Sequence, residues 1–135
     1  MCHNEVYVCP KKVVFTEKAP KPVGPYSQAV ISGDLVFVSG QIPINPETSK
    51  VVEGGIEAQT VQVLENIKNI LGSIGLTLDD VVKTSVFLSS LNDFQSFNRV
   101  YSRYFEVNPP ARTTVQAGLM AGVLVEIDAI AKKSS

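Results

Sequence analysis

The chain has 135 residues, of which 44% are hydrophobic and 19% are charged, and its formal net charge at pH 7 is −1. This composition is typical of one globular domain and excludes intrinsic disorder for most of the chain. The near-neutral charge gives no electrostatic basis for binding a nucleic-acid duplex or an anionic membrane, and no segment has the apolar length of a membrane span.

The two cysteines, Cys2 and Cys9, and the single histidine, His3, all lie near the N-terminus. They provide no disulfide framework, which favours a reducing compartment, and the N-terminus resembles neither a secretory signal nor a transit peptide, so we expect a cytoplasmic protein. Three candidate ligands without a fourth make a poor zinc site, so we expect no metal. Catalysis that needs a positioned imidazole is also disfavoured. Arginine, carboxylate, hydroxyl and backbone groups are then left for any chemistry.

The first part of the chain predicts an N-terminal extension and three strands. We expect residues 1–11 to form the extension and residues 12–135 to form a single domain. The strands are expected at 12–16, 26–31 and 35–39. Ser32-Gly33-Asp34 forms a tight turn that makes a hairpin of the last two strands. Residues 40–55 contain two prolines and two adjacent glycines, and this composition predicts a loop.

Two helices alternate with the remaining strands. Apolar residues recur with helical spacing over 56–74, and Gly75 follows as the expected C-terminal glycine. A second amphipathic helix is expected over 93–105, before two consecutive prolines. The remaining strands are expected at 81–88, 111–117 and 123–131.

The resulting element order is β-β-β-α-β-α-β-β, with each helix between strands, as a crossover connection requires. It predicts an α+β fold in which both helices pack on one face of a mixed sheet. The other face then needs a cover, and in so small a chain we expect a partner subunit to provide it.

Five segments carry a resemblance to a known family when they are taken together and in order. They are GPYSQAV (24–30), VSGQIP (38–43), LNDF (91–94), PARTT (110–114) and VEIDAIA (125–131). The chain resembles the RidA/YjgF family of reactive-intermediate, or imine, deaminases over residues 12–131. The resemblance implies a chorismate-mutase-like α+β fold. It also implies a homotrimer with ligand sites in the clefts between subunits.

The resemblance further implies hydrolysis of reactive 2-imino acids and their enamine tautomers to 2-keto acids and ammonia, with no cofactor. The implied substrates are 2-iminobutanoate and 2-iminopropanoate. The matching motifs make Arg112 the residue that holds the substrate carboxylate and Glu126 a catalytic carboxylate. They also predict a substrate-binding set, which consists of Tyr26, Ser39, Gly40, Asn98, Arg112 and Thr114. Many members have Cys where this chain has Thr114, so a thiol-dependent step is excluded at that position.

The two central residues also have plain structural interpretations. A guanidinium offers two parallel donors that match a carboxylate, but an arginine at the start of a strand can simply be solvated. Glu126 and Asp128 fit the polar face of an alternating strand. A role for Glu126 in moving a proton to the departing amine would need burial to raise its pKa. The mechanism we expect has Arg112 anchor the carboxylate while water attacks the imine carbon, without a covalent intermediate.

Two other function classes stay open at this point. An endoribonuclease or translation inhibitor, an activity also attached to some family members, would need a basic stripe with stacking aromatics, and the charge balance and lack of a central histidine disfavour it. A non-catalytic module could use the same clefts to bind small carboxylates. Turnover, rather than affinity, distinguishes this module from an enzyme.

Overall fold

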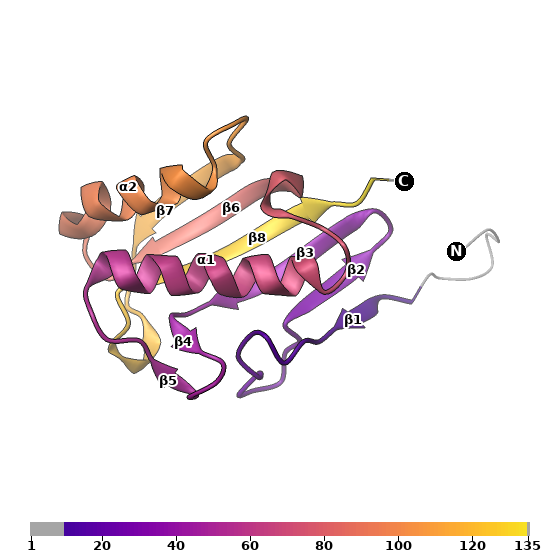
Figure 1. Cartoon of the computed structure of the whole chain (residues 1–135), viewed down its shortest axis with the longest axis horizontal. Coiled ribbons are helices and arrows are strands. Elements are labelled where there is room, and N and C mark those ends of the chain that lie inside the picture. Colours follow the sequence, from indigo (N-terminus) through magenta and orange to yellow (C-terminus); the bar gives the residue numbers. More distant parts are fainter. Residues whose placement is uncertain (1–9, 135) are drawn as a thin grey trace.

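A six-stranded mixed sheet with two α-helices forms the body of the protein in the computed structural model, which describes residues 10–134 (Figure 1). The strands of the sheet are β1 (Lys12–Val14), β2 (Ala29–Ser32), β3 (Leu35–Gln41), β6 (Val81–Leu88), β7 (Ala111–Gln116) and β8 (Val125–Lys132). They lie in the order β1-β2-β3-β8-β6-β7. Strands β6 and β7 pair in parallel, and the other neighbours pair antiparallel. The last strand along the chain therefore lies in the middle of the sheet.

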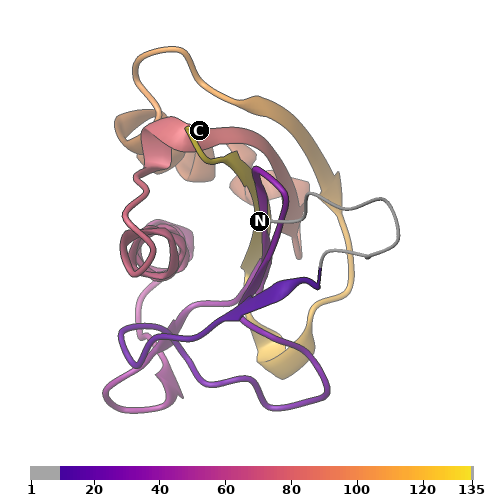
Figure 2. The same cartoon turned by 90° about the vertical axis from the view of Figure 1, so that its right-hand side faces the viewer.

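Both helices pack on the same face of this sheet, as Figure 2 shows. Helix α1 (Ile56–Gly72) lies over β3 and β8, and helix α2 (Phe94–Tyr104) connects β6 to its parallel neighbour β7. The inward stripe of α1 is fully buried, and it consists of Val63, Leu64, Ile67, Ile70 and Leu71. Alternate residues of β8 face this stripe from the sheet and are also buried, namely Val125, Ile127, Ala129 and Ala131. The expected α+β fold with both helices on one face is confirmed, since this shared apolar layer is what holds helices and sheet together.

Two predicted segments differ from the structure. The strand expected over 26–31 begins only at Ala29, because Tyr26 N–H donates to the Gly24 carbonyl in a turn and the Gln28 side chain bonds to the preceding loop. The loop expected over 40–55 contains a small hairpin of β4 (Ile44–Asn45) and β5 (Lys50–Val51), and β3 extends to Gln41. Short 3-10 turns precede β6, α2 and β8, at Leu78–Asp80, Leu91–Asp93 and Met120–Gly122.

The face of the sheet opposite the helices is partly apolar. Val13, Val30, Phe37 and Ile130 lie in one row across β1, β2, β3 and β8, according to the strand register. Val13 and Phe37 are 61% and 42% exposed. Within residues 10–134 no helix covers this row.

The N-terminal residues of special interest in the sequence, Cys2, His3 and Cys9, lie outside the described residues. The division into an extension over 1–11 and a domain over 12–135 therefore stays a prediction. Neither α-helix of the described chain is long and apolar enough to cross a bilayer.

Candidate functional site

The first group of predicted site residues gathers around Arg112, on the edge strand β7 beneath α2. Alternation along β7 turns Arg112 and Thr114 toward the helix side, since their partners in β6, Thr84 and Val86, are buried there. The Arg112 Nη1 atom donates a hydrogen bond of 2.7 Å to Asn98 Oδ1 on α2. The structure thus brings together three of the residues that the motifs predict.

The guanidinium of Arg112 is half-buried, and no carboxylate within residues 10–134 forms an ion pair with it. Because buried charges are ordinarily paired, a half-buried cation with free donors is suited to binding an anion. Two residues along the same strand face, the Thr114 hydroxyl oxygen is buried and has no hydrogen-bond partner. A ligand oxygen or nitrogen placed beside Arg112 could satisfy that hydroxyl.

The second group lies where β3 and β8 meet on the opposite face of the sheet. Between Val38 and Gln41 the register shifts by one residue, so Ser39 and Gly40 together face Asp128 of β8. This bulge brings the Gly40 backbone against the Glu126 carboxylate so closely that a Cβ atom at position 40 would collide with it. A larger residue at this position would therefore have to push the flexible Glu126 side chain aside, and the reason is close approach rather than an unusual backbone angle.

Burial raises the pKa of the Glu126 carboxyl, and the neighbouring Asp128 carboxylate raises it further. No side-chain hydrogen bond or ion pair reaches Glu126 from the described part of the chain. The sequence could not establish whether Glu126 is buried enough for its pKa to be raised, and in the structure it is. A raised pKa makes this carboxyl a better proton donor to a bound molecule than an ordinary exposed glutamate.

Tyr26 and Ser39 flank the second group. Tyr26 and Gly40 line the same small cavity of about 40 Å³. The Ser39 hydroxyl donates to the Ser27 carbonyl at 2.6 Å, which ties the bulge to the Gly-Pro-Tyr-Ser segment. The Ser39 side chain therefore already has a partner, and so do its backbone N–H and carbonyl, which bond to the Gln28 carbonyl and the Gln41 side chain.

A buried glutamine holds the loop beside Tyr26. The Gln28 Nε2 atom donates to the carbonyls of Thr16 and Pro20 at 3.0 and 2.9 Å, and Gln28 Oε1 accepts from Thr16 N–H at 2.7 Å. Asn66 of α1 acts in the same way on the segment after the bulge, by donating to the Ile42 and Ile44 carbonyls. Sequence reasoning missed both amides, and their only signal was a polar residue inside an otherwise apolar pattern.

The two groups do not meet within one chain. Thr84 of β6 pairs with Arg112 of β7 on one side and with Ala129 of β8 on the other. Glu126 is three residues from Ala129 along β8, and β8 is two strands away from β7. At about 3.3 Å per residue and about 4.8 Å per strand, this places the Cα atoms of Arg112 and Glu126 about 14 Å apart, and their side chains leave the sheet on opposite faces. One chain therefore holds an anion-binding half and a carboxylate half as separate surfaces.

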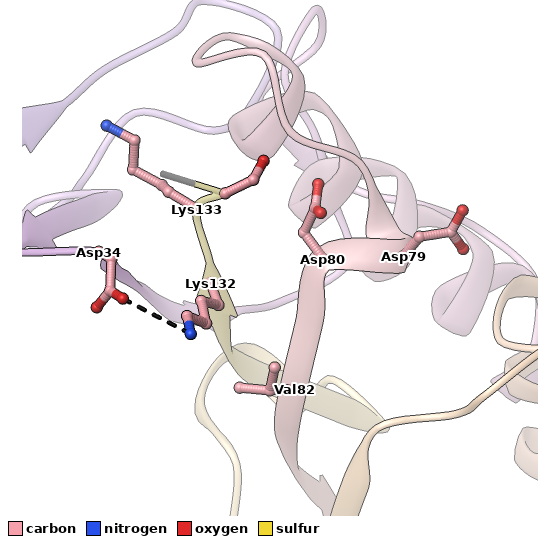
Figure 3. Close-up of a pocket in the computed structure, with 7 residues that line it drawn as sticks. Asp34, Asp79, Asp80, Val82, Lys132 and Lys133 are labelled. Carbon is pink, nitrogen blue, oxygen red and sulfur yellow. Dashed lines mark ion pairs between the residues drawn. The ribbon is translucent and has the colours of Figure 1, made fainter.

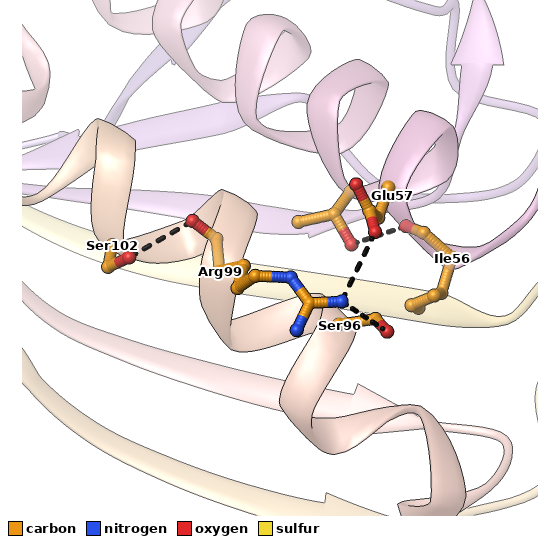
Figure 4. A network of polar contacts seen from close by, with 6 residues as sticks. Ile56, Glu57, Ser96, Arg99 and Ser102 are labelled. Carbon is orange, nitrogen blue, oxygen red and sulfur yellow. Dashed lines mark hydrogen bonds and ion pairs between the residues drawn. The ribbon is translucent and has the colours of Figure 1, made fainter.

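The larger surface pockets contain neither Arg112 nor Glu126, the two charged residues of the predicted site. An open pocket of about 420 Å³ at the far end of β8 is shown in Figure 3. It contains the exposed Lys132–Asp34 ion pair, at 3.7 Å, and the carboxylates of Asp79 and Asp80. On the outer side of the two helices, Arg99 pairs with Glu57 at 3.5 Å and also donates to Ser96 (Figure 4). Exposed ion pairs of this kind are ordinary surface features.

Comparison with known proteins places the chain and its fold within one family. The family model described as Endoribonuclease L-PSP matches residues 16–133. Over 125 residues the chain is 56% identical to a RutC family protein of Saccharolobus solfataricus, covering 92% of this chain and 99% of that protein. Over 122 residues it is 42% identical to the human protein named 2-iminobutanoate/2-iminopropanoate deaminase, covering 90% and 89% of the two chains.

A solved structure agrees at the level of the whole fold. The E. coli protein TdcF, determined with bound serine, has a TM-score of 0.87 and 40% sequence identity to this chain, with 91% of this chain and 99% of that chain covered. The region matched by the family model, residues 16–133, spans every residue of the two groups described above. Since the family model and the relatives cover nearly the whole chain, the protein belongs to the RidA/YjgF family.

Proposed function

We propose that this protein hydrolyses reactive 2-imino acids to 2-keto acids and ammonia, with 2-iminobutanoate and 2-iminopropanoate as substrates. The observation that carries the proposal is the half-buried guanidinium of Arg112, which Asn98 orients and which no carboxylate pairs within residues 10–134. A fork of this kind fits the carboxylate of a 2-imino acid. The name of the human relative and the serine bound to E. coli TdcF support a small substrate of this chemistry.

The proposed reaction consumes one water molecule and needs only groups that the chain supplies. Arg112 holds the substrate carboxylate, and the Thr114 hydroxyl binds beside it. Water attacks the imine carbon, and the resulting carbinolamine expels ammonia as its hydroxyl oxygen becomes the keto oxygen. Glu126, whose pKa burial raises, moves a proton to the departing nitrogen. Because free imines already hydrolyse in water, orientation and local electrostatics suffice for the required acceleration.

We infer that the complete site forms between two copies of the chain in a homotrimer. Arg112 and Glu126 leave opposite faces of the sheet, so one chain by itself presents only half of the proposed machinery. The apolar row of Val13, Val30, Phe37 and Ile130 favours a second copy as the cover of the open face. Tyr26, Ser39 and Gly40 would then join Glu126 as the wall facing the arginine of a neighbouring copy. We further propose that the protein is located in the cytoplasm.

The test generates 2-iminobutanoate or 2-iminopropanoate in place with an amino acid oxidase and traps the imine with semicarbazide. We expect the wild-type protein to suppress the trapped product, because hydrolysis competes with trapping. The Arg112→Ala variant should lose about 100-fold or more in activity, since a bidentate charged hydrogen bond contributes a few kcal/mol. Circular dichroism checks that the variant keeps its fold.

The same assay separates the proposal from its alternatives. A folded wild-type protein that binds 2-keto acids without suppressing the trapped product would be a carboxylate-binding module and not an enzyme. Cleavage of RNA with a steep salt dependence, in the absence of imine turnover, would instead favour the activity for which the family model is named.

A further inference from the structure

Three aromatic rings of α2 surround the inner side of the Arg112 guanidinium. The Cζ atom of Arg112 lies 4.8 Å from the ring centroid of Tyr101, 5.6 Å from that of Phe94 and 5.8 Å from that of Phe97. A cation within about 6 Å of a ring centroid is attracted to the negative face of the ring, and the attraction strengthens when water is excluded. The amphipathic pattern expected over 93–105 gives no sign of this arrangement, since the pattern does not place the helix beside Arg112.

Tyr101 is the nearest of the three rings and is held in place by its hydroxyl group. Its Oη atom lies 2.7 Å from Thr84 Oγ1, and both residues are buried. Thr84 is the residue of β6 directly opposite Arg112 in the parallel register. The ring of Phe105 packs against Tyr101 from the other side, with centroids 4.7 Å apart. Tyr101 therefore cannot turn away from Arg112 without breaking a buried hydrogen bond.

Asn98 and Tyr101, one turn apart on α2, act on different parts of the same guanidinium. The Asn98 carbonyl accepts one N–H and sets the plane of the group, while the Tyr101 ring lies against it. Within the described chain these contacts take the place of the carboxylate that usually accompanies a buried arginine. The remaining donors of Arg112 therefore stay available for a ligand.

We propose that Tyr101 is a positioning residue, whose ring, anchored by Thr84, holds the Arg112 guanidinium in the orientation that receives a substrate carboxylate. The inference rests on the proposed function, since it concerns the same site. Tyr101 does not contact the reacting atoms in this scheme. Burial raises the pKa of its hydroxyl, although the Thr84 hydrogen bond and the Arg112 charge lower it, so the ring stays neutral over the working pH range.

The test compares substitutions at Tyr101 with a matched substitution on the same helix. Tyr101→Leu removes the ring face, and Tyr101→Phe removes only the anchor. Phe105→Leu deletes a ring of similar burial from the same stack, but Phe105 makes no cation–π contact with Arg112. Isothermal titration with 2-oxobutanoate, the keto acid product, measures carboxylate binding independently of turnover, and the trapping assay gives KM and kcat.

We expect Tyr101→Leu to raise both the Kd for 2-oxobutanoate and the KM about tenfold, the equivalent of about 1.4 kcal/mol. The kcat should change little, because the carboxylate is bound equally in the ground state and the transition state. Tyr101→Phe and Thr84→Val should each raise Kd about threefold, since the ring remains but is less restricted. Phe105→Leu should also lower the melting temperature, though less than Tyr101→Leu, which leaves the buried Thr84 hydroxyl without its partner, and should leave Kd unchanged.

The two proposals fail in different ways. Equal Kd values for wild type, Tyr101→Leu and Tyr101→Phe would overturn the role of Tyr101 while leaving the deaminase proposal intact. A wild-type protein that binds 2-oxobutanoate through Arg112 but shows no imine turnover would remove the deaminase proposal and leave Tyr101 to be judged on Kd. A wild-type protein that binds no carboxylate would overturn both. If Tyr101→Leu does not fold, the threefold effects of Tyr101→Phe and Thr84→Val decide the question.

Discussion

The arginine half and the carboxylate half of the candidate site differ in how far one chain completes them. Arg112 is fixed by Asn98 and by rings of α2, all from the same helix–strand unit. Glu126 has a close backbone neighbour in Gly40 and a like charge in Asp128, but no donor from the described residues. The arginine half is therefore preorganised within one chain, whereas the half-buried Glu126 lacks a hydrogen-bond donor from the described residues.

This difference follows from where the halves lie in the sheet. Arg112 is on the helix-covered face, where α2 can supply contacts, and Glu126 is on the open face, where within residues 10–134 only the sheet itself is at hand. In the proposed homotrimer, another copy brings the half that one chain lacks. The predictions below combine changes to the two halves, change the carboxylate half alone, and then change a pair that belongs to neither half.

The largest effect is expected when variants of the two halves are combined. Arg112→Ala and Glu126→Gln should each be nearly inactive alone. Co-expressed in equal amounts, they should recover about a quarter of wild-type activity, because each interface that pairs an intact arginine with an intact glutamate is restored. The imine-trapping assay measures the recovery. Mixtures that stay at the level of the single variants would mean that both halves act within one chain.

The next effect concerns the contact between Gly40 and Glu126. In Gly40→Ala the new methyl group would displace the Glu126 carboxylate, which is the flexible end of its side chain. We expect activity to fall about tenfold or more, as for a misplaced acid or base, with little change in melting temperature. Gly72→Ala is the matched control, because a Cβ atom there meets nothing and alanine favours the helix. A Gly40→Ala variant with full activity would remove Glu126 from the mechanism.

A smaller effect tests the burial of Glu126 itself. Its pKa in the folded protein is raised above the usual 4.5, so the folded state binds the proton more tightly than the unfolded state. Stability of the wild type should therefore fall as pH rises through the raised pKa. The pKa is raised by contacts within one chain, so we expect Glu126→Gln to be the more stable form at pH 7, with the difference shrinking as pH falls toward 4. Melting temperatures measured over this range check the sign, and the opposite trend would mean that the cation proposed to face Glu126, Arg112 of a neighbouring copy, outweighs burial and Asp128.

The smallest effect is expected at the exposed pair between Arg99 and Glu57, which makes no hydrogen bond or ion pair to Arg112 or Glu126 (Figure 4). Both side chains are more than half exposed, so solvent and salt screen the attraction. Glu57→Gln should lower the free energy of unfolding by about 0.3 kcal/mol and leave imine hydrolysis unchanged. Urea unfolding measures the difference. A loss above about 1 kcal/mol would indicate that the pair helps to dock α2.

Much of the local structure could be predicted from the sequence. The spacing of Val63, Leu64, Ile67, Ile70 and Leu71 requires one helical stripe, and all five are buried in the structure. The alternation in β8 likewise predicts which residues face the core. The family motifs, among them Gly-Pro-Tyr and Pro-Ala-Arg, supplied the predicted site residues. These features depend only on residues that are a few positions apart in the chain, so they can be recognised in a single sequence.

The arrangement of the site depended on the tertiary structure. Periodicity assigns a residue to one side of its own strand, but it cannot say that β8 lies between β3 and β6 or that Arg112 and Glu126 leave opposite faces. The bulge at Ser39 and Gly40 arises only from pairing with β8, and the burial of Gln28 only from the loop folded over it. The sequence alone determined the elements and the chemistry they carry. Long-range strand pairing decided where that chemistry is placed, because contacts between distant segments set both the strand order and the burial that raises the pKa of Glu126.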